Sequence, residues 1–455
     1  MTFVDEGKKM RTQGRRGHQD TARHVPCKED RYRRPKIKNE DSQPFLSNAN
    51  VPVTAGEEVY PSKKDGQLIL MASPRAEQDQ LVSCFIAAMF PLGAASMQTS
   101  LLGTWLWHIP PRLGMNAALD YAALAVALAY FGKTTEDSLA LKGAESSYGA
   151  ALQNLAVMLE MESKQFQPEV LCATMLLGQY ELFAGTSHAF IRHAGGASRL
   201  MRLRGARRSY ESAFDAQATD RVEFKIAEAI VSKEPCFLEQ AAWQAVPDGL
   251  IKFPLLPKDA VLYHRIFCHY SSIPGLLKSF GEVTHDTSQD IIANLLSKSS
   301  ALCERMKKWY TDYLSFGGGY RTPVLVEKSM VGEDDSMFKR VYIYYDAISA
   351  ANITAYYAYR LLLQQRMDTL QPGFYSADNI WLAESICMSV DYLSRLKFTG
   401  ATVLRLSLPI AQLVLPAKYQ AWITSKLTPF SRGPYGQDLL PAISSDFRFY
   451  RDWRI

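Results

Sequence analysis

The residues with the clearest chemical potential form a basic run near the N-terminus: Arg31, Arg33, Arg34, Lys36 and Lys38. Closely spaced positive side chains can contact nucleic-acid phosphates, and such contacts produce salt-dependent binding with little sequence preference. A run of this kind is also typical of a nuclear import signal. We expect import to be its main role, because an import receptor can bind the run without a folded DNA-reading module.

The net charge of the chain is concentrated around this run. Residues 1–50 carry 12 Lys and Arg and 7 Asp and Glu, so their net charge of +5 equals the formal charge of the whole chain. The remaining residues are therefore neutral overall. A basic arm on a neutral body indicates an electrostatic partner, which is nucleic acid, an anionic membrane or an import receptor. A solvated tail without a partner is the alternative.

Cysteine and histidine offer little for metal chemistry. The chain has seven cysteines and no C-x-x-C pair, and an odd, scattered set is typical of a reducing compartment. Near the basic run lie Cys27, His18 and His24, and these three ligands cannot hold two zinc ions. His264 and Cys268 are four residues apart on a predicted helix, but no third ligand shares their face, so a packed core helix is the better prediction. We expect no metal site.

No pattern for catalysis or cofactor binding accompanies these residues. The sequence lacks G-x-S-x-G, H-E-x-x-H, G-x-x-x-x-G-K-[ST] and G-x-G-x-x-G. His193 has no nucleophile placed near it by the sequence, so we expect it to make a structural hydrogen bond. Three consecutive glycines at 317–319 are predicted to form a loop that holds no phosphate. The sequence therefore predicts a protein that is not an enzyme and has no cofactor.

The elements that position these residues are predicted to be helices. Residues 1–75 carry charge runs, prolines and few large apolar side chains, so we expect a disordered basic tail. Residues 76–455 are predicted to form an all-α multi-helix bundle with irregular linkers, because no stretch alternates apolar and polar side chains between hairpin turns. The apolar stretches 81–90 and 117–131 are shorter than the roughly 20 residues of a membrane span, so we expect core helices and no membrane partner.

Proline and glycine indicate where several helices begin or end. Pro110 predicts a break, Gly132 predicts the C-terminal end of a helix, and Pro409 predicts a first helical position. The predicted helices are residues 77–90, 116–132, 135–162, 168–183, 187–204, 220–232, 235–243, 260–270, 289–314, 335–366, 377–395 and 408–415.

The segment 176–205, LLGQYELFAGTSHAFIRHAGGASRLMRLRG, joins two of these helices. Its characteristic residues are Tyr180, Glu181, His193, Gly195, Gly196, Arg204 and Gly205. In type and order they resemble the core of the fungal-specific transcription factor domain. The resemblance extends from about residue 80 to about residue 450, with further similar stretches at Tyr148-Gly-Ala-Ala-Leu152, Phe237-Leu238, Trp243, Tyr359-Arg360 and Ile386-Cys-Met-Ser389-Val390-Asp-Tyr392.

The resemblance implies a nuclear regulator whose helical region controls activity, dimer contacts or the response to effectors. In this family a zinc cluster that begins C-x2-C-R-x-R-K-x-K-C binds DNA, because its thiolates aim a basic helix into the major groove. The stretch from Cys27 to Asp41 looks like an eroded copy. Asp30 and Asn39 stand where cysteines are expected, and Pro35 would break the recognition helix.

Three functional hypotheses follow. The first is a nuclear transcriptional regulator that controls a fungal secondary-metabolite gene cluster, as a co-regulator or a weak DNA binder. It would bind DNA directly or through a DNA-binding partner protein, and could form a homo- or heterodimer. The second is a full zinc-cluster activator whose first exon is incorrectly assigned in the gene. The third is a helical small-molecule-binding protein or enzyme. The ordered motifs favour the first.

Overall fold

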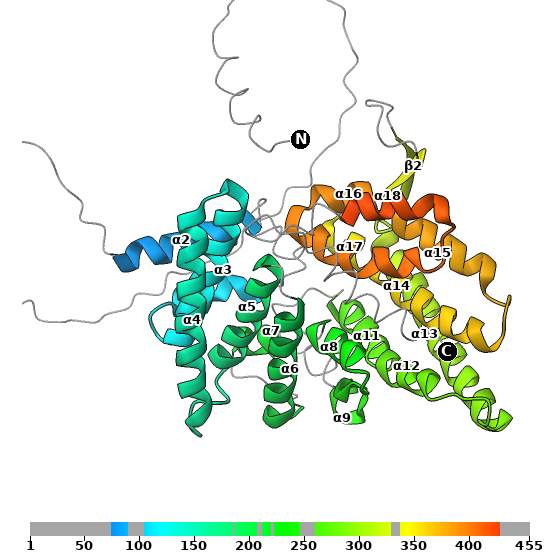
Figure 1. Cartoon of the computed structure of the whole chain (residues 1–455), viewed down its shortest axis with the longest axis horizontal. Coiled ribbons are helices and arrows are strands. Elements are labelled where there is room, and N and C mark those ends of the chain that lie inside the picture. Colours follow the sequence, from blue (N-terminus) through cyan, green and yellow to red (C-terminus); the bar gives the residue numbers. More distant parts are fainter. Residues whose placement is uncertain are drawn as a thin grey trace, which may run out of the picture. The chain divides into compact units, whose positions relative to one another are not determined.

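A computed structural model describes residues 74–89, 104–184, 187–206, 212–219, 223–245, 260–328 and 337–427 (Figure 1). The chain divides into two units, residues 1–69 and 70–455, and all described residues belong to the second. The predicted tail at 1–75 lies almost wholly outside the described residues, so its disorder and its boundary stay predictions.

The described part of the second unit is all-α apart from one small sheet, which confirms the predicted fold class. Its first half contains α2 (Pro74–Met89), η2 (Thr104–His108), η3 (Pro110–Arg112), α3 (Ala117–Thr135), α4 (Ser138–Glu160), α5 (Pro168–Ala184), α6 (Ser187–Arg204), α7 (Ala213–Thr219), α8 (Glu223–Ser232), η4 (Phe237–Glu239) and α9 (Ala241–Gln244). Its second half contains α11 (Ala260–Tyr270), α12 (Ile273–Gly281), α13 (Gln289–Ser315), η5 (Phe316–Gly318), β1 (Val324–Glu327), β2 (Arg340–Ile343), α14 (Ala347–Leu370), α15 (Ser376–Met388), α16 (Val390–Arg395), α17 (Lys397–Gln412) and α18 (Ala417–Leu427).

Helix α5 is the centre of the first half. It packs against α3, α4, α6 and α7, and every residue from Val170 to Glu181 is buried. A helix that is apolar all round must be covered on every side. The alanine-rich α3 packs against both α4 and α5, because small side chains let helix backbones approach closely. The motif residues of α5 therefore lie in the core.

Side-chain caps define where α3 and α4 begin. The Asn116 carboxamide oxygen accepts a hydrogen bond from the N–H of Leu119 at 3.1 Å. The Asp137 carboxylate accepts from the N–H groups of Leu139 and Ala140 at 2.8 and 3.3 Å. These contacts satisfy donors that the first helical turn leaves unpaired. Helix α4 consequently begins three residues later than predicted.

One predicted boundary in this half is wrong, and one predicted break is confirmed. Gly132 does not end α3, and the left-handed residue at the true end is Glu136 (φ 57°), whose N–H donates to the Gly132 carbonyl. A Cβ on Gly132 would lie 2.9 Å from the Leu141 side chain, so this glycine permits close packing of α3 against α4. The break predicted at Pro110 is confirmed, because η2 ends at His108 and no helix continues through Pro110. Pro110 itself begins the separate 3-10 helix η3, since proline is tolerated in a first helical turn.

Helix α14 is the centre of the second half. It packs against α12, α13, α15, α16 and α17, and it buries Tyr356, Tyr357 and Arg360. The predicted helix start at Pro409 is wrong, because α17 begins at Lys397 and contains this proline in its interior. Complete burial of Leu408 and its apolar neighbours offsets the backbone hydrogen bond that proline removes.

A small antiparallel sheet corrects the prediction that strands are absent. Val324 of β1 pairs with Ile343 of β2, and Glu327 pairs with Arg340. Strands of four residues are too short for an alternating pattern to stand out. Strand β2 occupies part of the region predicted to be one helix, so α14 begins later, at Ala347. Helices α7, α12 and α18 are further elements that the sequence analysis did not predict.

Within the part of the chain that the structure describes, no single helix is long and apolar enough to cross a membrane. The bent pair Trp105–Arg112 and Ala117–Thr135 passes that criterion jointly, by length and composition only.

Candidate functional site

Three helices bring part of the predicted motif together. Tyr148 lies on α4, Glu181 on α5 and His193 on α6. Helices α5 and α6 can approach closely at this level because Gly178 has no side chain: a Cβ there would lie only 3.3 Å from the Cβ of His193. The neighbouring Tyr180 stacks on Tyr148 with ring centroids 4.5 Å apart. Residues spread over the motif and the preceding helix thus form one cluster.

The cluster is a hydrogen-bonded triad. The Tyr148 hydroxyl donates to Glu181 Oε1 at 2.5 Å, and its oxygen lies 2.9 Å from His193 Nε2. Because the single phenolic proton goes to Glu181, the second contact requires His193 to carry its proton on Nε2 and to donate it. His193 therefore makes a structural hydrogen bond of the kind that the sequence suggested.

Burial sets the protonation of these groups. It lowers the pKa of His193 to about 4, with help from the charge of Arg192, so the imidazole is neutral at physiological pH. Burial also raises the pKa of Glu181, an effect that the Tyr148 hydrogen bond and Arg192 oppose. The pKa of Tyr148 is raised by burial and by the adjacent carboxylate. The triad therefore joins α4, α5 and α6 through one ionisable, mostly buried centre.

The end of the motif is a second polar anchor. Arg204, the last residue of α6, forms a buried ion pair with Asp215 on α7, and the two side chains are 4% and 1% exposed. Arg204 also donates to the Thr219 hydroxyl at 3.3 Å. Gly205 follows with φ 77°, and its N–H donates to the Met201 carbonyl at 3.0 Å. The basic end of the motif thus fastens α6 to α7, and glycine supplies the left-handed turn that stops the helix.

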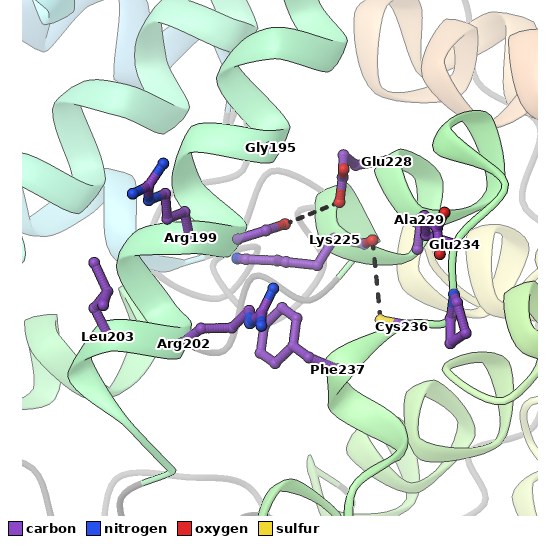
Figure 2. Close-up of a pocket in the computed structure, with 12 residues that line it drawn as sticks. Gly195, Arg199, Arg202, Leu203, Lys225, Glu228, Ala229, Glu234, Cys236 and Phe237 are labelled. Carbon is purple, nitrogen blue, oxygen red and sulfur yellow. Dashed lines mark hydrogen bonds between the residues drawn. The ribbon is translucent and has the colours of Figure 1, made fainter.

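A cavity of about 640 Å³ opens between α6, α8 and the segment that follows α8 (Figure 2). We call it the α6–α8 cavity. It is lined by Gly195, Ser198, Arg199, Arg202, Leu203, Lys225, Glu228, Ala229, Glu234, Pro235, Cys236 and Phe237. Of the two motif glycines, Gly195 faces this cavity, whereas a Cβ on Gly196 would lie 3.5 Å from Thr174 of α5. One glycine therefore contributes to the cavity wall and the other to helix packing.

The charged groups of the cavity differ in their surroundings. Lys225 is fully buried, whereas Arg199 and Arg202 are exposed. Glu228 accepts hydrogen bonds from Ser198 and Ser232 at 3.3 and 3.0 Å.

Cys236 also lines the cavity, and its thiol contacts the Lys225 carbonyl at 4.0 Å. Burial raises the pKa of this thiol to about 12 despite the nearby lysine charge. The thiol is therefore protonated at physiological pH and a poor nucleophile.

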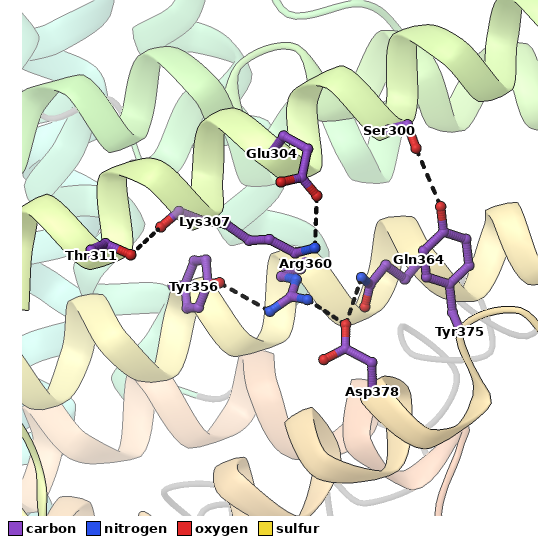
Figure 3. Close-up of polar contacts among 9 residues, drawn as sticks. All are labelled: Ser300, Glu304, Lys307, Thr311, Tyr356, Arg360, Gln364, Tyr375 and Asp378. Carbon is purple, nitrogen blue, oxygen red and sulfur yellow. Dashed lines mark hydrogen bonds and ion pairs between the residues drawn. The ribbon is translucent and has the colours of Figure 1, made fainter.

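A second polar network holds the other half together (Figure 3). Arg360 on α14 forms an ion pair with Asp378 on α15 and donates to the Tyr356 hydroxyl at 3.0 Å. Gln364, one turn further along α14, donates to the same carboxylate at 2.8 Å. In a separate contact, the Ser389 hydroxyl of the I-x-x-S-V-x-Y stretch lies 2.6 Å from the Tyr344 hydroxyl. Both family-like stretches of this half therefore serve internal packing.

The remaining predicted residues are placed as follows. The basic run Arg31, Arg33, Arg34, Lys36 and Lys38 lies outside the described residues, as do His18, His24 and Cys27. The side chain of His264 is also outside them, and Cys268 is half-buried. Among described residues, no group of three His, Cys, Asp or Glu side chains is arranged to hold a metal ion.

Sequence reasoning did not find Asp215, Asp378 or Lys225. Asp215 and Asp378 act through contacts with arginines 11 and 18 positions away, and none of the three residues belongs to a recognisable local pattern. One weak signal could have pointed to Lys225: it is flanked by apolar residues, in Phe-Lys225-Ile. A lysine in such a stretch can be carried into the interior, where lysine is seldom found unless it is paired.

The architecture is that of an all-α domain with a ligand-sized cavity beside its motif helices. Residues 86–231 match the family model of the fungal-specific transcription factor domain. This match covers about a third of the chain, from α2 into α8, and confirms the resemblance inferred from the sequence over these residues. The resemblance of the stretches beyond residue 231 stays a prediction. Over residues 86–231 the chain is therefore similar to the fungal-specific transcription factor domain, a family whose name indicates a role in transcriptional regulation.

A relative of the chain is a protein of Emericella nidulans that is described as uncharacterized. The two are 28% identical over 254 residues, which is 54% of each chain. The chain thus spans about half the length of this curated relative. No solved structure matches the chain.

Proposed function

We propose that this protein is a nuclear transcriptional regulator that acts on chromatin directly or through a DNA-binding partner protein. The observation that carries the proposal is the family match over residues 86–231, which coincides with the helices that form the Tyr148–Glu181–His193 triad and the Arg204–Asp215 pair. The helical domain supplies the regulatory scaffold and the contacts to partners, including a second copy or a related regulator.

The basic run at residues 31–38 supplies nuclear entry and, secondarily, phosphate contacts. Its five positive side chains suit an import receptor without any folded context. Phosphate contacts of this kind add affinity but little sequence preference. Target choice would then come from a partner protein. Control of a secondary-metabolite gene cluster is the biological role that we propose for the complex.

Chromatin immunoprecipitation of the tagged full chain tests the proposal. The wild type is compared with a variant in which Arg31, Arg33, Arg34, Lys36 and Lys38 are changed to alanine and a foreign import signal is added. Discrete peaks in both proteins would show recruitment through the helical domain. Peaks in the wild type alone would make the basic run a DNA-contacting segment. An absence of peaks in both would contradict the proposal.

Gene deletion provides an independent test of the regulatory role. Transcripts are compared between the wild-type and deletion strains under conditions that induce secondary metabolism. We expect a contiguous set of genes to change together. Identical transcript levels in the two strains would contradict the proposed role even if the protein is found in the nucleus.

A further inference from the structure

We propose that the α6–α8 cavity binds a small organic anion with an apolar body. The proposal goes beyond the regulatory function and does not depend on it, because it concerns binding by the isolated full-length protein. The volume of about 640 Å³ falls within the range of about 300–1,000 Å³ that is common for small-molecule sites.

The α6 wall of the cavity presents two arginines that suit an anion. Arg199 and Arg202 are three positions apart, so their side chains are neighbours on the helix surface and repel each other. Among the described residues, neither makes an ion pair. A guanidinium can bind a carboxylate or a phosphate through two parallel hydrogen bonds. A bound anion would relieve the repulsion between the two side chains.

The acidic residues of the cavity have partners of their own. Glu234 is paired with Lys278, with Nζ and Oε2 2.8 Å apart. Glu228 is held by the hydroxyls of Ser198 and Ser232. Lys225, whose side chain points towards α6 in Figure 2, is fully buried. The exposed cations of the lining are therefore Arg199 and Arg202.

The rest of the lining is apolar and explains why the ligand should have an apolar body. Phe237 lies beside the end of Arg202 in Figure 2, and Leu203, Ala229 and Pro235 complete this part of the lining. Leu203 is 59% exposed although it is a large apolar residue. An inorganic ion would leave these surfaces uncovered, whereas an aromatic or aliphatic acid would cover them.

The test uses two fluorescent probes that differ in one charged group. The first is 8-anilinonaphthalene-1-sulfonate, an apolar body with a sulfonate, and the second is neutral N-phenyl-1-naphthylamine. Both are titrated into the full-length protein at pH 7 and low salt. We expect one saturable site for the sulfonate and clearly weaker binding of the neutral probe. Decanoate should displace the sulfonate competitively.

Two variants assign the site to the cavity. R199Q/R202Q should weaken sulfonate binding at least about tenfold, because two hydrogen bonds to a charged group are lost. G195L fills the cavity: a Cβ at Gly195 lies at an ordinary 3.7 Å from Glu228, and the rest of the side chain enters the free volume. Leucine also favours the helix more than glycine does, so lost binding would not reflect a lost fold.

The matched control removes the same charge elsewhere. R265Q/R395Q changes two exposed arginines that do not line the cavity, and it should bind the sulfonate like the wild type. The proposal is overturned if the sulfonate does not bind, if it binds R199Q/R202Q or G195L as tightly as the wild type, or if the neutral probe binds equally well. Loss of binding in the control as well would mean a nonspecific charge effect and would also overturn it.

Discussion

The hydroxyl of Tyr148 donates a hydrogen bond to the carboxylate of Glu181 at 2.5 Å and so ties α4 to α5 in the interior of the domain. The two residues are 33 positions apart. The same hydroxyl oxygen lies 2.9 Å from Nε2 of His193 on α6, so one phenol fixes the relative positions of three helices. Two of the three residues belong to the motif by which the domain resembles its family.

Removal of this hydroxyl should destabilise the fold. In Y148F the Glu181 carboxylate loses the hydrogen bond from Tyr148, and a hydrogen bond to a charged group contributes about 1.5–3 kcal/mol. Urea unfolding followed by circular dichroism measures the loss. Y121F is the control, because Tyr121 is 39% exposed and its hydroxyl stays in water. Equal midpoints for Y148F and the wild type would show that the triad does not support the fold.

The triad should also make stability depend on pH. The folded-state pKa of His193 is about 4, below its ordinary value of 6.5. As the pH falls from about 6.5 towards 4, His193 becomes protonated in the unfolded chain but stays neutral in the folded chain. The contribution of His193 to the free energy of unfolding therefore decreases. The raised pKa of Glu181 acts in the opposite direction. Tyr148 stays neutral throughout this range, because its pKa is raised.

The contribution of His193 is isolated by comparing variants over that pH window. Between pH 7 and 4.5, H193Q should lose less unfolding free energy than the wild type does. His269, whose pKa burial also lowers to about 4, provides a parallel variant, H269Q, with a separate contribution of the same sign. Parallel stability curves for H193Q and the wild type would contradict the assigned protonation.

Substitution of only one partner of the Arg204–Asp215 ion pair should strongly lower the free energy of unfolding. Removal of one partner of a buried ion pair leaves an uncompensated charge and costs about 3–5 kcal/mol. We expect R204M and D215L each to be strongly destabilised, and R204M/D215L to recover part of the loss. K278M, which breaks the exposed pair with Glu234, should change stability little. Similar losses in K278M and R204M would show that burial does not set the energy of the Arg204 pair.

Two glycines should respond to alanine in opposite directions. A Cβ on Gly400 of α17 would clash with the carbonyl oxygen of Leu393 on α16, so G400A must push two helices apart, at a cost of about 1–3 kcal/mol or more. A Cβ on Gly149 of α4 would meet no atom within 4 Å. G149A should therefore stabilise by up to about 1 kcal/mol through helix propensity. Thermal unfolding of both variants measures the difference. Equal effects would contradict the close α16–α17 approach.

Local sequence determined the helical class and several helix boundaries. The helix predicted over residues 187–204 is α6, with these same bounds, because an amphipathic pattern and a following glycine act within a few residues. Residues 260–270 likewise form α11. The segment 176–205 was sufficient to indicate the family, since motif order is a property of the sequence itself.

Only the tertiary structure decided which polar residues meet and which boundaries yield to packing. The local sequence predicts a helix end at Gly132, yet α3 continues beyond it, because Leu141 packs against Gly132. The local sequence predicts a helix start at Pro409, yet this proline lies inside α17, where burial of its apolar neighbours stabilises the helix. The partners Asp215 and Asp378, and the lysine in the α6–α8 cavity, depend on how distant helices pack. Local patterns carry backbone preferences of about 1 kcal/mol per residue, and burial of side chains between helices outweighs them.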